Sequence, residues 1–254
     1  MYDVIVVGGG IIGCSVAWQL SKLEKKVLVI ERTDVASGSA GATDGVVGYH
    51  TKKPGVQLDL AVQSIEMFKT LGQELGMDVE YELNAGGLQP VEDKEQWDML
   101  SAMVEEQRKS GVDIRMISAE EACAIEPNLS KDIYGALYSP TSGKVNPLNL
   151  TAAYARAAKK LGAEIMTNTE VTGFIIEDGR CKGVMTSKGE FRADAVVNAC
   201  GSWAGKVAKL AGLDLPIKPR KGQLAVTEPI GPYLKATVQC ARYNVIKFRP
   251  ETIK

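Results

Sequence analysis

MYDVIVVGGGIIGCSVAWQLSKLEKKVLVIER, residues 1–32, is the stretch that decides the fold. Asp3–Val7 is a β-branched run that predicts a buried strand, and Val27–Ile30 predicts a second one. Residues 8–13 read G-x-G-x-x-G, and apolar residues at helical spacing follow them. Glu31 ends the second strand, eighteen residues after the last glycine of the pattern. The stretch therefore predicts a complete strand–helix–strand unit.

Each glycine of this pattern has a physical task. Gly8 lets the chain turn tightly off the strand, Gly10 lets a pyrophosphate approach the backbone, and Gly13 lets the helix pack close to the sheet. The free N–H groups at the helix start then face the phosphate. Glu31 can accept hydrogen bonds from both hydroxyls of an adenosine ribose, which disfavours the 2′-phosphate of NADP. The pattern predicts a dinucleotide site, and by itself it does not separate FAD from NAD.

The composition is that of an ordinary globular protein. Its 254 residues are 45% hydrophobic and 24% charged, enough for two lobes. A net charge of −1 gives no electrostatic case for nucleic acid or an anionic membrane. The five cysteines form no C-x-x-C and there is one histidine, so we expect no metal site. No apolar run approaches the roughly 18 residues of a membrane span, and the first strand begins without a signal peptide, so we expect a cytoplasmic protein.

Residues 33–55, TDVASGSAGATDGVVGYHTKKPG, are rich in Gly, Ser, Ala and Thr. A long loop in a compact domain is usually functional. The small residues would let its backbone wrap a flat ligand, whereas Val46, Val47 and Tyr49 are apolar enough to be buried.

The rest of the chain mixes helices and strands. We expect helices at 56–75, 93–110, 118–126, 146–162 and 202–210, three of them capped by Asp93, by Ser118 with Glu121, and by Asn146 with Pro147. We expect strands at 79–83, 87–91, 133–138, 164–167, 171–176, 181–186, 193–198 and 223–227, with a hairpin turn at 177–179. Because one sheet is left and re-entered, the domains are discontinuous. We place a nucleotide domain at 1–78 and 146–215, and a second lobe at 79–145 and 216–254.

Six ordered motifs resemble the D-amino-acid oxidase/glycine oxidase superfamily of FAD-dependent oxidoreductases. They are GGGIIG with Glu31-Arg32, ASGSAGATDGVVG (36–48), GALYSPTSGKVNP (135–147), AKKLGAEIMTNTEV (158–171), DAVVNACGSWAGKVAKLAGL (194–213) and LPIKPRKGQL (215–224). The chain is most similar to glycine oxidase, sarcosine oxidase-like and proline or hydroxyproline dehydrogenase β-type chains. The resemblance implies an α/β fold, with a Rossmann-like FAD-binding domain and a discontinuous α+β substrate lobe built on a mixed sheet.

The resemblance also implies a set of residues around FAD. It places Gly8, Gly10, Ile11, Ile12 and Gly13 beside the pyrophosphate, and Glu31, Arg32 and the backbone of Val171 by the ribose and adenine. It places Ser39 and Ala40 by the phosphate and ribityl chain, and Asp44, Gly45 and Val46 along the isoalloxazine. A second loop over the nucleotide would contain Ala199, Gly201 and Trp203. Two of these have plainer interpretations, since Val171 could be strand core and Trp203 ordinary packing.

The chemistry that the resemblance implies is hydride removal from the C–N bond of a small amino acid or secondary amine to flavin N5. Val46, Gly48 and Tyr243 would meet the substrate, Tyr243 through its carboxylate, although Tyr243 could also be an ordinary strand aromatic. We assign no catalytic acid or base. His50 could approach the flavin loop, but an ordinary loop histidine is the commoner case. Cys200 is expected to be a small buried residue and not a covalent flavin anchor.

Members of the family continue beyond FRPETIK, residues 248–254. The missing part holds later strands of the substrate lobe, a carboxylate-binding arginine and a final glycine-rich flavin loop. Two hypotheses therefore stand: an FAD-dependent amino-acid or amine oxidase or dehydrogenase, and a non-catalytic FAD-binding fragment or subunit that needs a partner chain or a second copy. An NAD-dependent enzyme is a minor third, which the ASGSAGATDG and VVNACG segments disfavour.

Overall fold

The computed structural model describes residues 1–83 and 86–242 and contains two compact units. The first unit comprises Met1–Asp44, Gly72–Val79 and Asn146–Ala225, and the second comprises Gly45–Leu71, Glu80–Val145 and the chain from Val226 on. This division differs from the predicted domains at residues 45–71, which belong to the second unit because one face of their helix lies in its core. It also differs at Val79 and at residues 216–225, which belong to the first unit. That one unit binds FAD and the other binds substrate stays a prediction.

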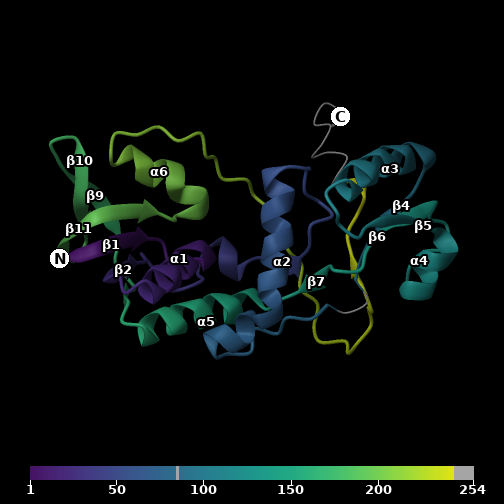
Figure 1. The fold of residues 1–254 in the computed structure, drawn as a ribbon, viewed down its shortest axis with the longest axis horizontal. Coiled ribbons are helices and arrows are strands. Elements are labelled where there is room, and N and C mark those ends of the chain that lie inside the picture. Colours follow the sequence, from purple (N-terminus) through teal and green to yellow (C-terminus); the bar gives the residue numbers. More distant parts are fainter. Residues whose placement is uncertain (84–85, 243–254) are drawn as a thin grey trace. The chain divides into compact units, whose positions relative to one another are not determined.

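A six-stranded sheet forms the centre of the first unit, in the order β8-β2-β1-β11-β10-β9 (Figure 1). Its strands are β1 (Tyr2–Val7), β2 (Val27–Ile30), β8 (Glu164–Met166), β9 (Val171–Glu177), β10 (Arg180–Thr186) and β11 (Gly189–Asn198). β8, β2, β1 and β11 run parallel, and β10 and β9 add an antiparallel hairpin. Ile5, Leu28, Ile30 and Val184 bury their side chains in its core. The predicted strand–helix–strand unit and the mixed α/β fold class are therefore confirmed.

Two helices, α1 (Ile11–Lys22) and α5 (Pro147–Lys160), pack against each other in the first unit (Figure 1). The rings of Trp18 and Tyr154 meet edge to face between them, with centroids 5.5 Å apart. As predicted, Asn146 caps α5, because its Oδ1 accepts hydrogen bonds from two backbone N–H groups of the first turn at 3.1 Å. The short helices η2 (Gly201–Trp203) and α6 (Ala204–Lys209) follow β11.

The second unit has a four-stranded sheet in the order β12-β4-β6-β5 and a separate two-stranded ribbon of β3 and β7. The strands are β3 (Val46–Val47), β4 (Gly87–Val91), β5 (Arg115–Ser118), β6 (Gly135–Ser139), β7 (Gly143–Lys144) and β12 (Thr237–Val238). Its helices are α2 (Val56–Leu75, except the last turn), α3 (Lys94–Arg108) and α4 (Ala119–Ile125). Leu58 and Ile65 of α2 pack with Val91, Leu100 and Leu137, so the apolar face predicted for this helix forms the core.

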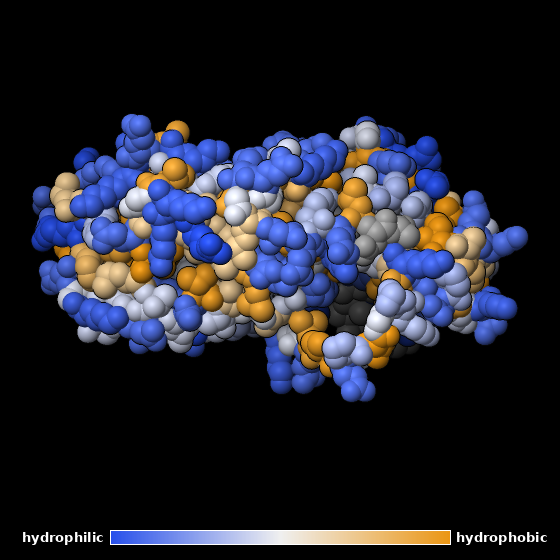
Figure 2. All heavy atoms as spheres, turned by 90° about the horizontal axis from the view of Figure 1, so that it is seen from below, coloured by the Kyte–Doolittle hydropathy of each residue, from blue (hydrophilic) through white to orange (hydrophobic). Residues whose placement is uncertain are grey.

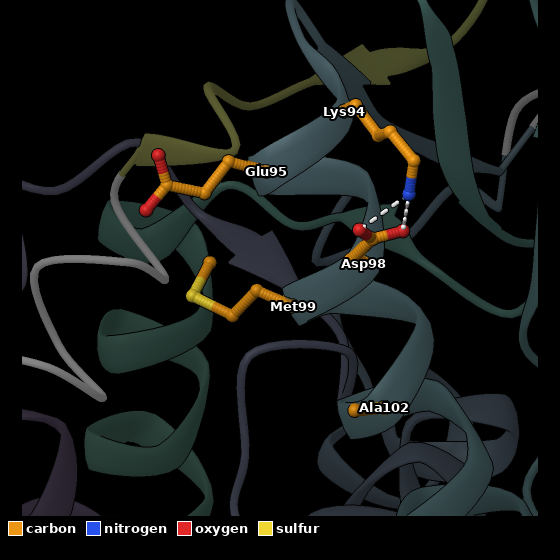
Figure 3. A pocket seen from close by; sticks show the side chains of 5 residues that line it. All are labelled: Lys94, Glu95, Asp98, Met99 and Ala102. Carbon is orange, nitrogen blue, oxygen red and sulfur yellow. Dashed lines mark hydrogen bonds and ion pairs between the residues drawn. The ribbon is translucent and has the colours of Figure 1, made fainter.

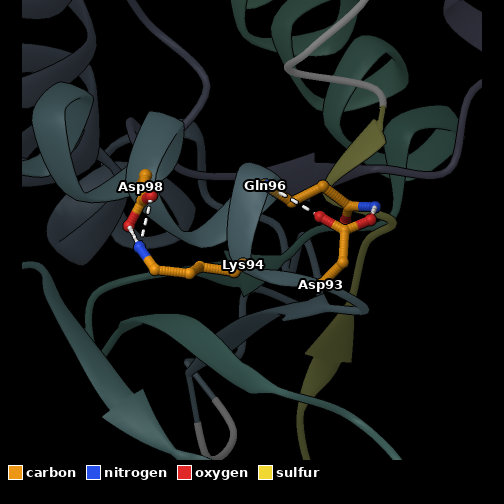
Figure 4. A network of polar contacts seen from close by, with 4 residues as sticks. All are labelled: Asp93, Lys94, Gln96 and Asp98. Carbon is orange, nitrogen blue, oxygen red and sulfur yellow. Dashed lines mark hydrogen bonds and ion pairs between the residues drawn. The ribbon is translucent and has the colours of Figure 1, made fainter.

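Side-chain caps fix where α3 and α4 begin. Asp93 Oδ1 accepts a hydrogen bond from the Gln96 backbone N–H at 2.8 Å, and Oδ2 accepts one from Gln96 Nε2 at 3.0 Å (Figure 4). Ser118 and Glu121 form the predicted capping box of α4. Each cap stabilises its helix by about 1 kcal/mol. The sequence therefore specifies both helix starts locally.

Two predicted strands do not form. Residues 79–83 contribute only an isolated bridge from Glu82 to Lys144, and residues 223–227 have no regular structure. Leu224 is 56% exposed and Val226 is 92% exposed. A strand needs a neighbour to receive its backbone hydrogen bonds, and none of the described strands lies beside 223–227, so the prediction of a strand there is wrong.

On the face shown in Figure 2, polar side chains predominate and apolar side chains form small patches.

Candidate functional site

The glycines after β1 have the geometry that the sequence predicts. Gly8 has φ of +113°, and a Cβ on it would lie 2.6 Å from the backbone oxygen of Ala199. A Cβ on Gly13 would lie 1.9 Å from the backbone oxygen of Gly8, whereas a Cβ on Gly10 would meet nothing within 4 Å. Gly8 and Gly13 thus allow close backbone contacts, and Gly10 leaves an open surface where a ligand could approach.

The start of α1 points unsatisfied donors at this open surface. Gly10 is the N-cap and offers no side chain, and the helical ladder begins with the bond from Cys14 N–H to the oxygen of Gly10 at 3.0 Å. The N–H groups of Ile11, Ile12 and Gly13 therefore precede the ladder. With the helix dipole, such a terminus favours a phosphate group.

The carboxylate of Glu31 is built into the glycine loop. Its Oε2 accepts a hydrogen bond from the Gly9 backbone N–H at 2.8 Å, and its Oε1 accepts from the backbone N–H and the hydroxyl of Thr33 at 3.0 and 3.1 Å. A carboxylate has about four acceptor positions, so roughly one remains, on Oε2. The sequence predicts contacts to two ribose hydroxyls, and this geometry leaves a direct acceptor for one of them.

The loop after Glu31 folds back onto the same glycines. Ala36 is buried with φ of +63°, and its N–H donates to the oxygen of Gly9 at 3.1 Å. The 3-10 turn η1 (Ser39–Gly41) follows, with Ser39 exposed and Ala40 half-buried. Left-handed backbone at a non-glycine residue is costly, so the bond to Gly9 holds this part of the loop in place.

A second loop, after β11, lies against the first. Ala199 N–H donates to the oxygen of Val7 at 2.8 Å, and Gly201 has φ of +50°. The guanidinium of Arg32 lies over the ring of Trp203, 4.6 Å from its centroid. The structure thus brings Arg32 and Trp203 together with the glycine loop, as expected if both face one nucleotide.

Val171 begins β9 and is buried in the core of the first unit. The chain just before it runs beside the Glu31 loop, since Asn168 N–H donates to Thr33 oxygen at 2.8 Å and Thr169 N–H to Glu31 oxygen at 2.9 Å. Its side chain therefore has the strand-core role, and its backbone lies in the segment that borders the Glu31 loop.

Two thiols lie near the glycine loop, and both are protonated at neutral pH. Burial, together with the negative charge of Glu31, raises the pKa of the Cys14 thiol to about 12 and that of the Cys200 thiol to about 11, although the positive charge of Arg32 opposes the shift at Cys200. Cys200 Sγ donates to the oxygen of Val7 at 3.2 Å. A thiol in this state is a poor nucleophile. Cys200 is half-buried and not fully buried as expected, and its having no covalent bond to flavin stays a prediction.

In the second unit, Gly45 is buried and Val46 is 42% exposed on strand β3. The prediction of a loop over this segment is corrected by the structure, in which β3 pairs with β7. His50 lies in the turn that follows β3, as expected for a loop histidine, but its side chain is only 4% exposed. The apolar neighbour Tyr49 is the one local signal for this burial.

Tyr243, which was expected to meet the substrate, lies outside the described residues. A pocket of about 540 Å³ is lined by one face of α3, Lys94, Glu95, Asp98, Met99 and Ala102, where Lys94 pairs with Asp98 (Figure 3). None of the predicted site residues lines it. Within residues 1–83 and 86–242 no cluster of three or more His, Cys, Asp or Glu could hold a metal ion.

In the part of the chain that the structure describes, no helix is both long and apolar enough to cross a bilayer.

The groups around the glycine loop fit the adenosine diphosphate half of FAD. A pyrophosphate fits the open backbone at Gly10 and the N–H donors at the start of α1, and a ribose hydroxyl fits the remaining acceptor on Glu31. The Arg32–Trp203 pair offers planar surfaces to an adenine ring.

Comparison with known proteins gives the same result. Residues 3–252 match the DAO family model, described as FAD dependent oxidoreductase. The chain is 33% identical over 246 residues to a glycine oxidase of Geobacillus kaustophilus, covering 93% of this chain and 64% of that protein. It is 33% identical over 241 residues to anaerobic glycerol-3-phosphate dehydrogenase subunit A1 of Haloferax volcanii, covering 88% and 40%. The crystal structure of glycine oxidase from Geobacillus kaustophilus superposes with a TM-score of 0.85 at 30% identity, covering 94% and 66%.

The chain thus spans less than two thirds of the length of the relatives it matches. The family match extends over almost all of the chain, through both units and every motif on which the resemblance rests. The chain belongs to the DAO family of FAD-dependent oxidoreductases.

Proposed function

We propose that this chain binds FAD without a covalent bond and serves the oxidation of the C–N bond of a small amino acid or secondary amine. The observation that supports the proposal is the close contact between the loops after β1 and β11, at Gly8 and Ala199, together with the hydrogen bond from Gly9 to the Glu31 carboxylate. Glycine, sarcosine, a D-amino acid or proline are the substrate types that the motifs favour. The cytoplasm stays the expected compartment.

The residues of the first unit would hold the nucleotide half of the cofactor. Donors at Ile11 and Ile12 would bind the pyrophosphate, Glu31 would accept from the ribose, and Arg32 with Trp203 would border the adenine. Ser39, Ala40 and the second loop at Ala199 and Gly201 would complete this set. When bound, the flavin supplies the two-electron acceptor for a hydride.

The second unit would supply the surroundings of the reacting centre. Gly45 and Val46, together with Asp44 of the first unit, would run along the isoalloxazine, and Val46 and Gly48 would also meet the substrate. The Tyr243 hydroxyl would donate to the substrate carboxylate. No residue is assigned as a catalytic base, since an amine that arrives neutral needs none for hydride loss.

A second candidate function is an FAD-binding subunit without activity of its own. It is favoured by a relative that is named as a subunit, the anaerobic glycerol-3-phosphate dehydrogenase subunit A1 of Haloferax volcanii. In this case a partner chain or a second copy would provide the remaining substrate-binding groups.

The test is to purify the chain, add FAD and record the visible absorption. A yellow protein that releases its chromophore on acid precipitation supports non-covalent binding, and a colourless protein that takes up no FAD contradicts the proposal. Anaerobic addition of glycine, sarcosine or proline then separates the two candidates. Bleaching by an amine, but not by glycerol-3-phosphate, supports the enzyme. An FAD-loaded chain that no amine bleaches supports the subunit.

A further inference from the structure

Residues 45–48 lie along residues 142–145 as a continuous antiparallel ribbon. Val145 N–H donates to the oxygen of Gly45 at 2.9 Å, and β3 and β7 pair Val46 with Lys144 and Val47 with Gly143. A Cβ on Gly48 would lie 2.8 Å from Ser142 Oγ and 3.0 Å from His50 Nδ1. The backbone at Gly48 therefore rests directly on the His50–Ser142 pair.

The imidazole of His50 joins this ribbon to the four-stranded sheet. Its Nδ1 lies 2.8 Å from Ser142 Oγ, and its Nε2 lies 3.1 Å from Gln239 Oε1, just after β12. Gln239 Oε1 also accepts from Gln89 Nε2 at 3.2 Å, on β4. Since a carbonyl oxygen only accepts, Nε2 carries the proton, and in the neutral ring Nδ1 accepts from the Ser142 hydroxyl. One buried ring thus connects β3, β7, β12 and β4.

The backbone on both sides of His50 is held by two further buried side chains, Tyr49 and Gln107. Tyr49 is buried, and its hydroxyl bonds to the backbone of Asp113 at 3.1 Å through both the N–H and the oxygen. Gln107, fully buried on α3, donates from Nε2 to the oxygens of Tyr49, His50 and Lys52 at 3.3, 3.4 and 2.7 Å. The backbone of residues 45–52 therefore has little freedom, and its position is set by buried polar side chains.

We propose that His50 is a positioning residue that fixes the ribbon of residues 45–48, and through it the groups that this ribbon presents to flavin and substrate. The part that concerns flavin and substrate rests on the proposed function. His50 acts through its contacts with Gly48, Ser142 and Gln239. One side chain that bonds to the side chains of two distant residues, Ser142 and Gln239, is suited to this role, because a buried polar network that loses one of its bonds is costly.

Two variants test the role by different means. His50→Leu keeps much of the volume and removes both hydrogen bonds. Gly48→Ala leaves every polar group in place and forces His50 and Ser142 apart, because its Cβ would lie within 3.0 Å of both. Gly222→Ala is the matched control for the glycine change, since a Cβ there meets nothing within 4 Å.

The first measurement needs no cofactor. Amide hydrogen exchange of the unloaded chain should be at least about ten-fold faster over residues 45–50 in both variants, with residues 4–14 unchanged. The control variant Gly222→Ala should leave the exchange of residues 45–50 unchanged. Unchanged exchange over 45–50 in both variants would overturn the proposal, whether or not the chain binds FAD, so this failure is distinct from that of the proposed function.

The second measurement uses the FAD-loaded chain. Both variants should shift the visible absorption bands of the flavin while the FAD dissociation constant stays within about three-fold, because the nucleotide loops are untouched. The amine concentration for half-maximal flavin reduction should rise about ten-fold, the size expected for one lost buried hydrogen bond. Flavin bands and amine dependence identical to those of the unsubstituted chain would show that the ribbon does not serve the flavin site.

Discussion

The carboxylate of Glu31 lies 2.8 Å from the backbone nitrogen of Gly9, and this bond closes the end of β2 onto the loop after β1. The acid expected to bind a ribose therefore also shapes the loop that would bind the pyrophosphate. Its two oxygens receive donors on opposite sides, Gly9 on Oε2 and Thr33 on Oε1. Any substitution of Glu31 changes the loop as well as the ligand contact.

Glu31→Ala should weaken FAD binding more than Glu31→Gln does. Alanine loses every acceptor, whereas glutamine keeps one oxygen but turns its NH₂ group toward either Gly9 N–H or Thr33 N–H. A hydrogen bond to a charged group is worth about 1.5–3 kcal/mol, so the alanine variant should lose about ten-fold or more in FAD affinity. Fluorescence titration of FAD measures this, and equal affinity in all three proteins would refute the role.

Gly10→Ala and Gly13→Ala should separate ligand binding from packing. A Cβ at position 13 meets the oxygen of Gly8 at 1.9 Å, so α1 must move and the free energy of unfolding should fall by about 1–3 kcal/mol. A Cβ at position 10 meets nothing, so stability should stay within about 0.5 kcal/mol while FAD binding weakens. Urea unfolding of the unloaded chain, beside FAD titration, checks both; a stable Gly13→Ala variant would contradict the close packing.

Glu126 should make the second unit sensitive to acid. Its fully buried carboxylate receives backbone N–H groups of Lys235, Ala236 and Asn128 at 2.6, 3.2 and 3.2 Å. Burial opposes the charge, but these donors outweigh it and lower the pKa of Glu126 below its ordinary value. A lowered folded pKa stabilises the protein above the ordinary glutamate pKa of about 4.3, and this contribution is lost as the pH falls through the folded pKa.

Glu126→Gln should therefore lower the free energy of unfolding by about 1–3 kcal/mol at pH 7. The difference from the unsubstituted chain should shrink steadily below about pH 4. Thermal unfolding followed at pH 7, 5, 4 and 3 measures it. A difference that stays constant over this range would show that the charge of Glu126 contributes nothing.

The cysteines should react with iodoacetamide in an order set by exposure and pKa. Cys240 is exposed, whereas burial and the charge of Glu31 raise the pKa values of Cys14 and Cys200 to about 12 and 11. At pH 8 we expect Cys240 to be alkylated well before either of these. Peptide mass spectrometry over time reads the order, and early labelling of Cys200 would contradict the packing described for it.

Most of the correct predictions of secondary structure rest on local patterns in the sequence. The spacing of apolar residues gave α2 with its bounds, and the caps at Asp93, Ser118 and Asn146 gave the starts of three helices. The turn before β10 is another case, since Asp178 and Gly179 both have positive φ, 49° and 72°. Each of these features depends on residues only a few positions apart.

The failures have one physical cause, which is pairing over long distances in the chain. β3, β7 and β12 are two residues long and exist only because a distant segment meets them, so no local pattern predicts them. Residues 223–227 are the reverse case, because this short apolar run has no neighbouring strand among the described residues. The buried state of His50 likewise depends on Ser142 and Gln239, which follow it far along the chain.

The register of β1 also determines when the sheet can be completed during synthesis. Val4 pairs with Val27 on one side and with Ala195 on the other. At about 5–20 residues per second, a ribosome needs roughly 10–30 s to pass from the first partner to the second. Until then one edge of β1 has no partner, and an unpaired apolar edge recruits other strands. The nascent chain is therefore the form most exposed to aggregation, and its yield should depend on chaperones and growth temperature more than on the stability of the finished fold.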